Sequence, residues 1–455
     1  MISAPFVPPC PYRPQHPYAL LPWVRIARDN SAAVWPVGAF WASFMARGLP
    51  GRKLFVLNNA TAVRQVLLTN AANYQKSRDT RRVLRPLIGD GLFISEGPLW
   101  RRQRRLLMPA LHARRLPDFL PVMGQVGLEM LERWERLGAG AEVDMGREMT
   151  RVTAEVVSRV LLSFPLGQGR TDAVYTAFND YQDSLGRLDV LGLLGAPDWL
   201  PRPGEGRARQ AVAVVDALID EILQARAPGR QPGRGDLLDL LLGARDEAGL
   251  ALAPCLVRDE IKVLFLAGHE TTATTLVWAL FLLASSPAVQ EQVKVEADRT
   301  LGAEVPGPQE LERLVFTRAV VQESLRLYPP IHQFAREALG EDRIGEHLIP
   351  PGSLMLVAPW LLHRHHRYWS EPDAFRPERF LRTPERRRPK HAYLPFSTGP
   401  RLCPGAAFGM AETTLILALA VQRFRLFLRP GHPVEPLGRL TLRPRLGMPL
   451  RLERR

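Results

Sequence analysis

A cysteine-containing loop directly before a long apolar segment constrains the fold of this chain more than any other feature. The loop reads Phe396-Ser-Thr-Gly399-Pro-Arg401-Leu-Cys403-Pro404-Gly405. Residues 404–424 follow it with apolar positions three and four apart, which predicts a helix. Proline fits the first position of a helix, so we expect Cys403 at the N-cap, where the positive helix end favours a thiolate.

The other residues of this loop suit a flat, acidic ligand above the sulfur. Gly399 and Gly405 permit backbone conformations or close approaches that a side chain would block. Arg401 offers a charged fork to a carboxylate. The alternative is a structural cysteine after a turn, because free cysteines are commonly buried.

Length and composition describe a folded protein and leave the partner class open. The chain has 455 residues, which fits about three domains or one large helical enzyme domain. The net charge of +14 indicates an acidic partner: nucleic acid, an anionic membrane or an acidic protein. Three distant cysteines exclude a disulfide framework or a four-cysteine metal site. We expect a monomer in a reducing, cytoplasmic compartment.

The N-terminal region predicts neither a secretory signal nor a membrane span. No cationic segment leads into an apolar core near the first residue. The most apolar early stretch, residues 32–46, is interrupted by Pro36 and Gly38. We therefore expect no transmembrane segment.

Helical periodicity dominates the rest of the chain. Apolar residues recur at helical spacing in residues 121–138, 148–163, 208–226 and 256–286, as well as in residues 404–424. Between residues 331 and 400 the pattern changes to short apolar pieces rich in proline, which predicts strands and coil. The predicted fold class is mainly α with small β-sheets. Residues 199–207 and 227–236 are interpreted as surface loops within a single domain that spans residues 1–455, with residues 1–50 as a lead-in.

The longest predicted helix, residues 254–286, contains Ala267-Gly268-His269-Glu270-Thr271-Thr272 at its centre. Gly268 weakens a helix by about 1 kcal/mol relative to alanine. The Thr271 hydroxyl can compete for the carbonyl of Ala267, four residues back. We therefore predict a local opening of the helix, with a mildly distorted core helix as the alternative.

A further helical segment places Glu323 and Arg326 on one face, three residues apart. Taken alone, such a pair is typical of a solvated ion pair with a small effect on stability.

Together these segments resemble the cytochrome P450 family. The Cys403 loop matches the family's haem-thiolate pattern, Phe-x-x-Gly-x-Arg-x-Cys-x-Gly, at every defined position. The resemblance implies a triangular helical prism, with haem b between the oxygen-binding helix and the cysteine-ligand helix. It also implies that Cys403 is the axial ligand of the haem iron.

Two other segments resemble the same family. The sequence from Ala267 to Thr271 resembles the oxygen-binding helix, which implies that Ala267 and Gly268 lie beside the haem, that Thr271 holds the distal water or oxygen, and that Glu270 helps to deliver protons. Glu323, Arg326 and Arg379 resemble the family's buried Glu-Arg-Arg network, whose implied role is structural.

The resemblance also implies which residues hold the haem propionates. Trp100 and Arg104 lie one helical turn apart and resemble the family's Trp-x-x-x-Arg segment. Arg336 and Arg401 would add two further arginine forks.

The implied function is a monooxygenase that inserts one oxygen atom from O2 into a fatty acid, a terpenoid or a similar lipid-like molecule. Without a fused reductase, electrons would come from an acidic ferredoxin or flavodoxin and its NAD(P)H reductase. The resemblance implies that this donor docks at the arginine cluster within residues 101–105. Substrate contacts are expected from Val83–Phe93, from residues 172–210 and just after Pro330.

The alternatives are a peroxygenase or isomerising member on the same fold, and a non-catalytic haem-thiolate sensor or electron carrier. Nucleic-acid binding is not expected, because no recognition motif accompanies the basic clusters at 101–105 and 386–388, which are taken as solvated faces.

Overall fold

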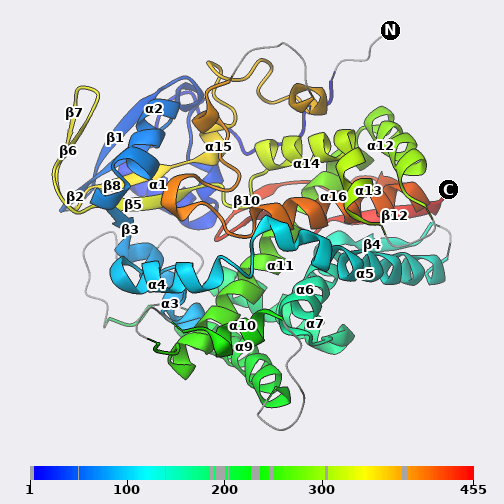
Figure 1. Ribbon diagram of the computed structural model, residues 1–455. Helices are drawn as coiled ribbons and strands as arrows, with labels where there is room; N and C mark the ends of the chain where they lie inside the picture. Colours follow the sequence, from blue (N-terminus) through cyan, green and yellow to red (C-terminus); the bar gives the residue numbers. More distant parts are fainter. Residues whose placement is uncertain are drawn as a thin grey trace.

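Two apolar helices organise the fold, and both lie in the interior of the molecule (Figure 1). The first is α11 (Pro254–Ala284), which begins with proline at its first turn and ends shortly before Pro287, where a new helix begins. The second is α16 (Ala406–Arg423), which is buried along most of its length. Helices that are apolar on all sides belong in a core, and these two contact one another there.

The computed structural model describes residues 5–49, 51–138, 140–184, 189, 200–202, 204–226, 236–245, 249–302, 306–381 and 388–455. The other helices in these ranges are α1 (Leu20–Asp29), α2 (Ala60–Arg64), α3 (Arg78–Ile88), α4 (Gly97–Leu107), α5 (Leu116–Arg136), α6 (Met145–Leu162), α7 (Gly167–Ser184), α9 (Glu205–Ala225), α10 (Leu237–Gly243), α12 (Pro287–Thr300), α13 (Pro308–Arg313), α14 (Val315–Leu327) and α15 (Pro359–Leu362).

The largest sheet lies at one side of the helical body (Figure 1). Its strand order is β1-β2-β8-β5-β3, from β1 (Phe44–Leu49), β2 (Arg52–Leu57), β8 (Leu354–Val357), β5 (Phe334–Ala338) and β3 (Tyr74–Lys76). Only β2 and β8 are parallel, and the other neighbours are antiparallel. In the β3–β5 register Lys76 lies opposite Arg336, so the sheet places two cations side by side at its edge.

Three smaller sheets complete the described strands. They are β4 (Glu142–Asp144), β12 (Pro449–Arg454) and β9 (Phe424–Leu428) in one sheet, the pair β10 (Pro436–Gly438) and β11 (Leu442–Pro444), and the pair β6 (Asp342–Ile344) and β7 (His347–Ile349).

The predicted fold class, mainly α with small β-sheets, is confirmed. The five helices expected from apolar periodicity are present, with ends displaced by several residues at most. Strands β5 to β8 fall in the segment predicted as short strands and coil. Strands β1 and β2 and helix α7 were not predicted from the sequence, whereas the helical segment around Glu323 and Arg326 is α14. Most of residues 185–199 and all of residues 227–235, where a substrate loop and a surface loop were expected, lie outside the described residues.

Membrane-spanning helices were sought in the described part of the chain. No single helix there has the length and apolar character to cross a membrane. Helices α11 and α12 meet that criterion only when taken together, and they are bent by 113° at the break between them.

Candidate functional site

The loop before α16 holds Cys403 through its backbone. The N–H of Cys403 donates to the carbonyl of Phe396 over 3.0 Å. Helix α16 begins at Ala406 with Gly405 as its N-cap, and Pro404 lies in the preceding turn. The prediction that Cys403 would be the N-cap is therefore wrong, because two further residues are needed to turn the chain into the helix.

The Cys403 side chain is accessible to solvent on one side, although protein surrounds it elsewhere. Burial raises the pKa of its thiol, while the N–H of Gly405 and the charge of Arg104 act in the opposite direction. The N–H at the start of α16 thus favours the thiolate, as the sequence predicted, but burial opposes it more strongly. A metal cation bound to sulfur would supply the missing stabilisation, because metal ligation deprotonates a thiol.

The two glycines of the loop have different surroundings. Gly399 has φ +73°, and a Cβ added there would lie 2.0 Å from the carbonyl oxygen of Leu67. This close approach is to the π-helical segment Gln65–Thr69, whereas a cofactor contact was expected. At Gly405 a Cβ would meet no described atom within 4 Å, so the protein leaves room on that side of the loop.

The central turn of α11 has an accessible face inside an otherwise buried stretch. Ala267 is exposed and Thr271, one turn later, is half-buried, while Phe265, Leu266 and the residues after Thr271 are buried. This helix approaches the start of α16 where a Cβ on Gly409 would lie 3.6 Å from the Thr272 hydroxyl. The accessible turn therefore lies near the Cys403 loop.

The expected local opening of α11 is absent, because the helix is continuous from Pro254 to Ala284. The Thr271 hydroxyl does donate to the carbonyl of Ala267, over 2.8 Å, as the sequence predicted. This bond coexists with the helix instead of breaking it.

Gly268 has a packing role in the structure. A Cβ at this position would lie 2.9 Å from a methyl group of Val157 on α6. The hydroxyl of Thr153, also on α6, donates to the carbonyl of His269 over 3.0 Å. Gly268 therefore permits a close contact between α6 and α11, and its predicted contact with the cofactor stays a prediction.

The Glu270 side chain is hydrogen-bonded to residues of two other segments of the chain. Its Oε1 accepts hydrogen bonds from the Thr441 hydroxyl over 2.8 Å and from the Gln182 amide over 3.2 Å. Burial raises the pKa of Glu270 to about 7, although these donors and Arg443 favour its charged form. Neither Gln182 nor Thr441 was predicted from the sequence.

A cluster of cations lies beside the Cys403 loop. Arg401 forms an ion pair with Glu96, and its guanidinium lies 4.4 Å from the centre of the Trp100 ring. Its Nη1 is buried and has no hydrogen-bond partner in the described structure. Arg104 donates to the carbonyl of Leu402 over 2.8 Å, next to Cys403. Helix α4 thus carries Trp100 and Arg104 to the loop.

The sheet edge adds two more cations to this cluster. Burial and the nearby charge of Arg401 lower the pKa of Arg336 to about 10. Burial and the same arginine lower the pKa of Lys76 to about 6, while Glu96 acts in the opposite direction. Lys76 donates to the carbonyl of Leu92 over 2.9 Å. Glu96 is the only carboxylate that forms an ion pair with one of these four cations in the described structure, so the cluster fits a group with two carboxylates.

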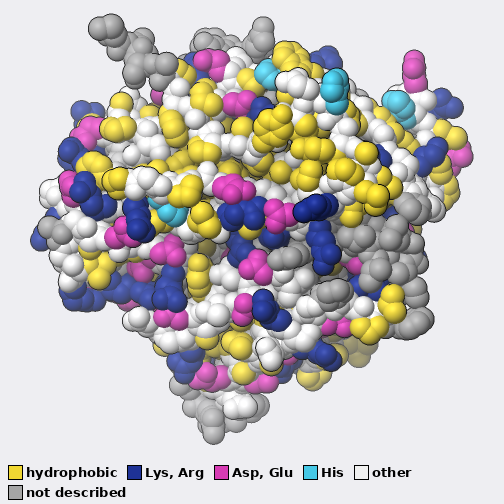
Figure 2. All heavy atoms as spheres, turned by 180° about the vertical axis from the view of Figure 1, so that it is seen from behind, with side chains coloured by type: hydrophobic (Ala, Val, Ile, Leu, Met, Phe, Trp, Pro, Cys, Tyr) yellow, Lys and Arg dark blue, Asp and Glu magenta, His cyan; other side chains and the backbone are white. Residues whose placement is uncertain are grey.

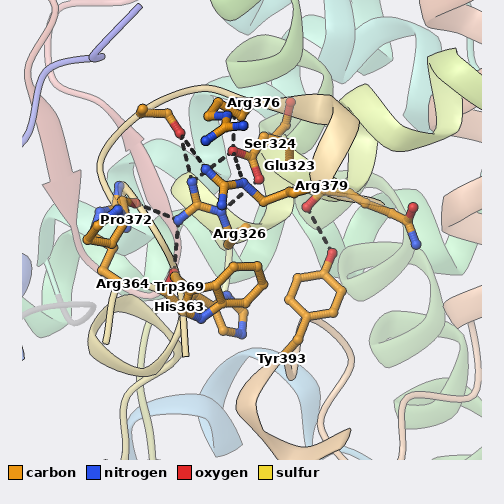
Figure 3. Close-up of polar contacts among 12 residues, drawn as sticks. Glu323, Ser324, Arg326, His363, Arg364, Trp369, Pro372, Arg376, Arg379 and Tyr393 are labelled. Carbon is orange, nitrogen blue, oxygen red and sulfur yellow. Dashed lines mark hydrogen bonds and ion pairs between the residues drawn. The ribbon is translucent and has the colours of Figure 1, made fainter. Parts of the chain in front are cut away.

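The three residues of the predicted Glu-Arg-Arg network are buried together, as Figure 3 shows. Glu323 and Arg326 on α14 are fully buried and bond to each other over 2.7 and 2.8 Å. Arg379, in the 3-10 helix Pro377–Phe380, donates to Glu323 over 3.1 Å. Arg326 also donates to the carbonyls of His363 and Ala374, so its guanidinium joins three chain segments. The arrangement excludes the alternative of a solvated surface pair.

The two basic clusters are only partly the solvated faces expected from the sequence, since Arg101 and Arg105 are exposed while Arg102 and Arg388 are half-buried. Arg388 lies 4.2 Å from the centre of the Trp369 ring and donates to the carbonyl of Arg379, and residues 386 and 387 lie outside the described structure. Arg102 is half-buried and donates to the carbonyls of Leu250 and Ala251. On the face shown in Figure 2, basic and acidic side chains are interspersed, so that face has no continuous basic patch for nucleic acid.

Comparison with known proteins decides the family. The cytochrome P450 family model matches residues 36–449, which is most of the chain. The chain belongs to the cytochrome P450 family. A haem cofactor follows from this membership, and the enzyme class predicted from the sequence, a P450 monooxygenase, is confirmed.

Relatives of this P450 include two enzymes of Streptomyces melanosporofaciens. Cyclooctatin synthase is 33% identical over 414 residues, covering 89% of this chain and 88% of the relative. Cyclooctat-9-en-7-ol 5-monooxygenase is 31% identical and covers 86% and 85%. The solved structure of the cytochrome P450DA heme domain is similar with a TM-score of 0.79 and 28% identity, over 91% of this chain and 90% of that chain.

Among the described residues, no group of three or more histidine, cysteine or acidic side chains could hold a metal ion.

Proposed function

We propose that this P450 inserts one oxygen atom from O2 into a terpenoid or similar lipid-like molecule, within a single haem domain that binds haem b through Cys403. The observation that carries the proposal is the accessible turn of α11, with the Thr271 hydroxyl on it, near the Cys403 loop. The names of the two Streptomyces relatives favour a terpenoid over a fatty acid. A spectral binding screen that compares cyclooctat-9-en-7-ol with palmitate tests this preference.

The cation cluster would hold the two haem propionates. Arg336 and the free Nη1 of Arg401 are the strongest candidates, since both are largely enclosed and underpaired. Trp100 would support Arg401 through its ring, and Arg104 and Lys76 would add positive charge. Two carboxylates would offset charges for which, in the described structure, Glu96 forms the one ion pair.

The bound haem supplies O2 activation, and the protein must supply two protons. The Thr271 hydroxyl lies on the accessible turn of α11, and its hydrogen bond to the carbonyl of Ala267 orients it. Glu270 would act as the acid, because a pKa of about 7 lets a carboxyl take up and release protons near neutral pH. The Thr271 hydroxyl bonds to the carbonyl of Ala267, whereas Glu270 bonds to Thr441 and Gln182. A water would therefore connect the two groups.

Replacing Thr271 with alanine is expected to leave haem and substrate binding nearly unchanged while lowering the product formed per NADPH by about tenfold or more. Without the hydroxyl, proton delivery is disordered and reduced oxygen leaves as hydrogen peroxide. The measurement compares product, NADPH consumed and hydrogen peroxide in both proteins, with cyclooctat-9-en-7-ol as the probe.

Thr272→Ala is the matched control, since its hydroxyl bonds to the carbonyl of Gly268 in the same way. Equal yields of product per NADPH in Thr271→Ala and wild type would show that Thr271 is only a core helix residue. Turnover with hydrogen peroxide alone, without NADPH, would identify a peroxygenase instead.

We propose that an acidic ferredoxin or flavodoxin supplies the electrons at the surface around α4. Arg101 and Arg105 are exposed on this helix, whose Arg104 contacts the Cys403 loop. Charge reversal of Arg101 and Arg105 is expected to slow reduction at low salt by about tenfold, and to flatten its dependence on salt. Stopped-flow reduction by an acidic ferredoxin measures both.

The control for this experiment is Arg343→Glu, an exposed arginine on the β6–β7 hairpin. Arg102 is left unchanged, because it bonds to backbone carbonyls and its replacement would disturb the fold. Unchanged reduction rates in the double variant would mean that the donor docks elsewhere.

A further inference from the structure

The side chains of Glu270, Gln182 and Thr441 come from distant segments and meet at one carboxyl oxygen of Glu270. Glu270 lies on α11, Gln182 on α7, and Thr441 in the turn between β10 and β11. The Thr441 hydroxyl is 2.8 Å and the Gln182 amide nitrogen 3.2 Å from Oε1 of Glu270. Gln182 and Thr441 are buried, so bulk water does not replace these contacts.

The Thr441 hydroxyl has two neighbouring acceptors but only one hydrogen. The second acceptor is Oε1 of Gln182, at 3.1 Å. When Glu270 is charged, the hydroxyl donates to Glu270, and Gln182 Oε1 accepts the backbone N–H of Thr441 over 3.2 Å. When Glu270 is protonated, its own O–H can donate to Thr441, whose hydrogen then turns to Gln182. Both protonation states are satisfied without movement of any heavy atom.

The segments that carry these groups are fixed to one another. The indole N–H of Trp278 on α11 donates to the carbonyl of Leu442 over 2.7 Å. Arg443 donates to Asp183 on α7 over 2.6 Å. The β10–β11 turn is therefore held by both helices, and Thr441 stays in place while the hydrogen moves.

Among Glu270 and its titratable neighbours Arg443, Tyr175 and His269, Glu270 is the one expected to change its charge near neutral pH. Arg443 favours the carboxylate but is itself paired with Asp183. Tyr175 on α7 has a pKa raised by burial, so it stays neutral. His269 bonds to the carbonyl of Phe265, and burial lowers the pKa of its ring to about 4.

We propose that Thr441 is a positioning residue for proton delivery: with Gln182, it holds the Glu270 carboxyl in one place whether or not that carboxyl carries its proton. This inference rests on the proposed role of Glu270 in the oxygen chemistry. It assigns a part in that chemistry to a β-turn far from α11 in sequence. The residue acts through Glu270 and contacts no reacting atom.

The test is infrared titration of the Glu270 carboxyl in the haem-loaded protein, with Glu270→Gln used to assign the band. Thr441→Val removes the donor at nearly constant volume and is expected to raise the pKa of Glu270 by about 1, a tenfold increase in proton affinity. Thr441→Ser restores the hydroxyl and is expected to titrate like the wild type. Thr413→Val is the control, because that buried hydroxyl bonds only within α16, to Gly409.

A Thr441→Val protein that titrates like the wild type would overturn the inference, as would Thr441→Ser behaving like Thr441→Val. Turnover of cyclooctat-9-en-7-ol separates this inference from the proposed function. If Glu270→Gln forms as much product per NADPH as the wild type, the proposed proton role of Glu270 is wrong. If Glu270→Gln loses product while Thr441→Val keeps both yield and titration, only the assignment of Thr441 is wrong.

Discussion

Replacing Cys403 with serine is expected to abolish the absorption band that a reduced haem-thiolate protein gives with carbon monoxide. Serine has no sulfur, and its hydroxyl does not ionise in the range where a metal-bound thiol does. The variant therefore has no thiolate ligand at this position. The loop backbone should persist, because the N–H of residue 403 still donates to Phe396. Difference spectroscopy of the reduced protein measures the result.

The matched control is Cys255→Ser. Cys255 is an exposed cysteine in the first turn of α11, and its replacement should leave the band unchanged. A Cys403→Ser protein that retained the band would place the iron ligand elsewhere.

The second large effect is expected from Glu323→Ala. This change leaves Arg326 fully buried with no carboxylate partner, at a cost of about 3–5 kcal/mol. That is a large part of the stability of an ordinary domain, about 5–15 kcal/mol. We therefore expect little folded, haem-loaded protein. Haem content per polypeptide and chemical denaturation of the soluble fraction measure the loss.

Asp298→Ala provides the comparison, because it removes the acid of an ion pair with Lys294 that is partly exposed on α12. Such pairs contribute about 0–1 kcal/mol. A normal haem-loaded yield of Glu323→Ala would contradict the structural role of the network.

Local signals were sufficient for five of the helices and for the cysteine loop. Helices α5, α6, α9, α11 and α16 follow from apolar spacing, which depends on nearby residues alone. The Glu323–Arg326 pair also follows from spacing, but its burial depends on the segments around Pro372 and Trp369. A sequence pattern therefore identified the pair without showing that it is buried.

The sequence is least informative where distant segments decide the outcome. Gly268 and Gly399 were predicted as cofactor contacts, and the structure adds close contacts of these glycines with Val157 and Leu67, which the sequence did not indicate. Glu96, Lys76, Gln182 and Thr441 were missed, because no local motif marks them. Their contacts with the site depend on the tertiary fold, which brings strand β3, helix α7 and the β10–β11 turn together there.

The contacts between the cysteine loop and the region around α4 join segments that are synthesised at very different times. Glu96 and Arg401 are 305 residues apart in the chain, and Arg104 and Leu402 are 298 apart. Contacts of such separation form late, because the intervening chain must first be made and arranged. During synthesis, α4 and the β3 edge leave the ribosome long before the segment that carries the sulfur. With Cys403 as the proposed ligand, haem capture therefore follows the release of the segment around residue 403 from the ribosome.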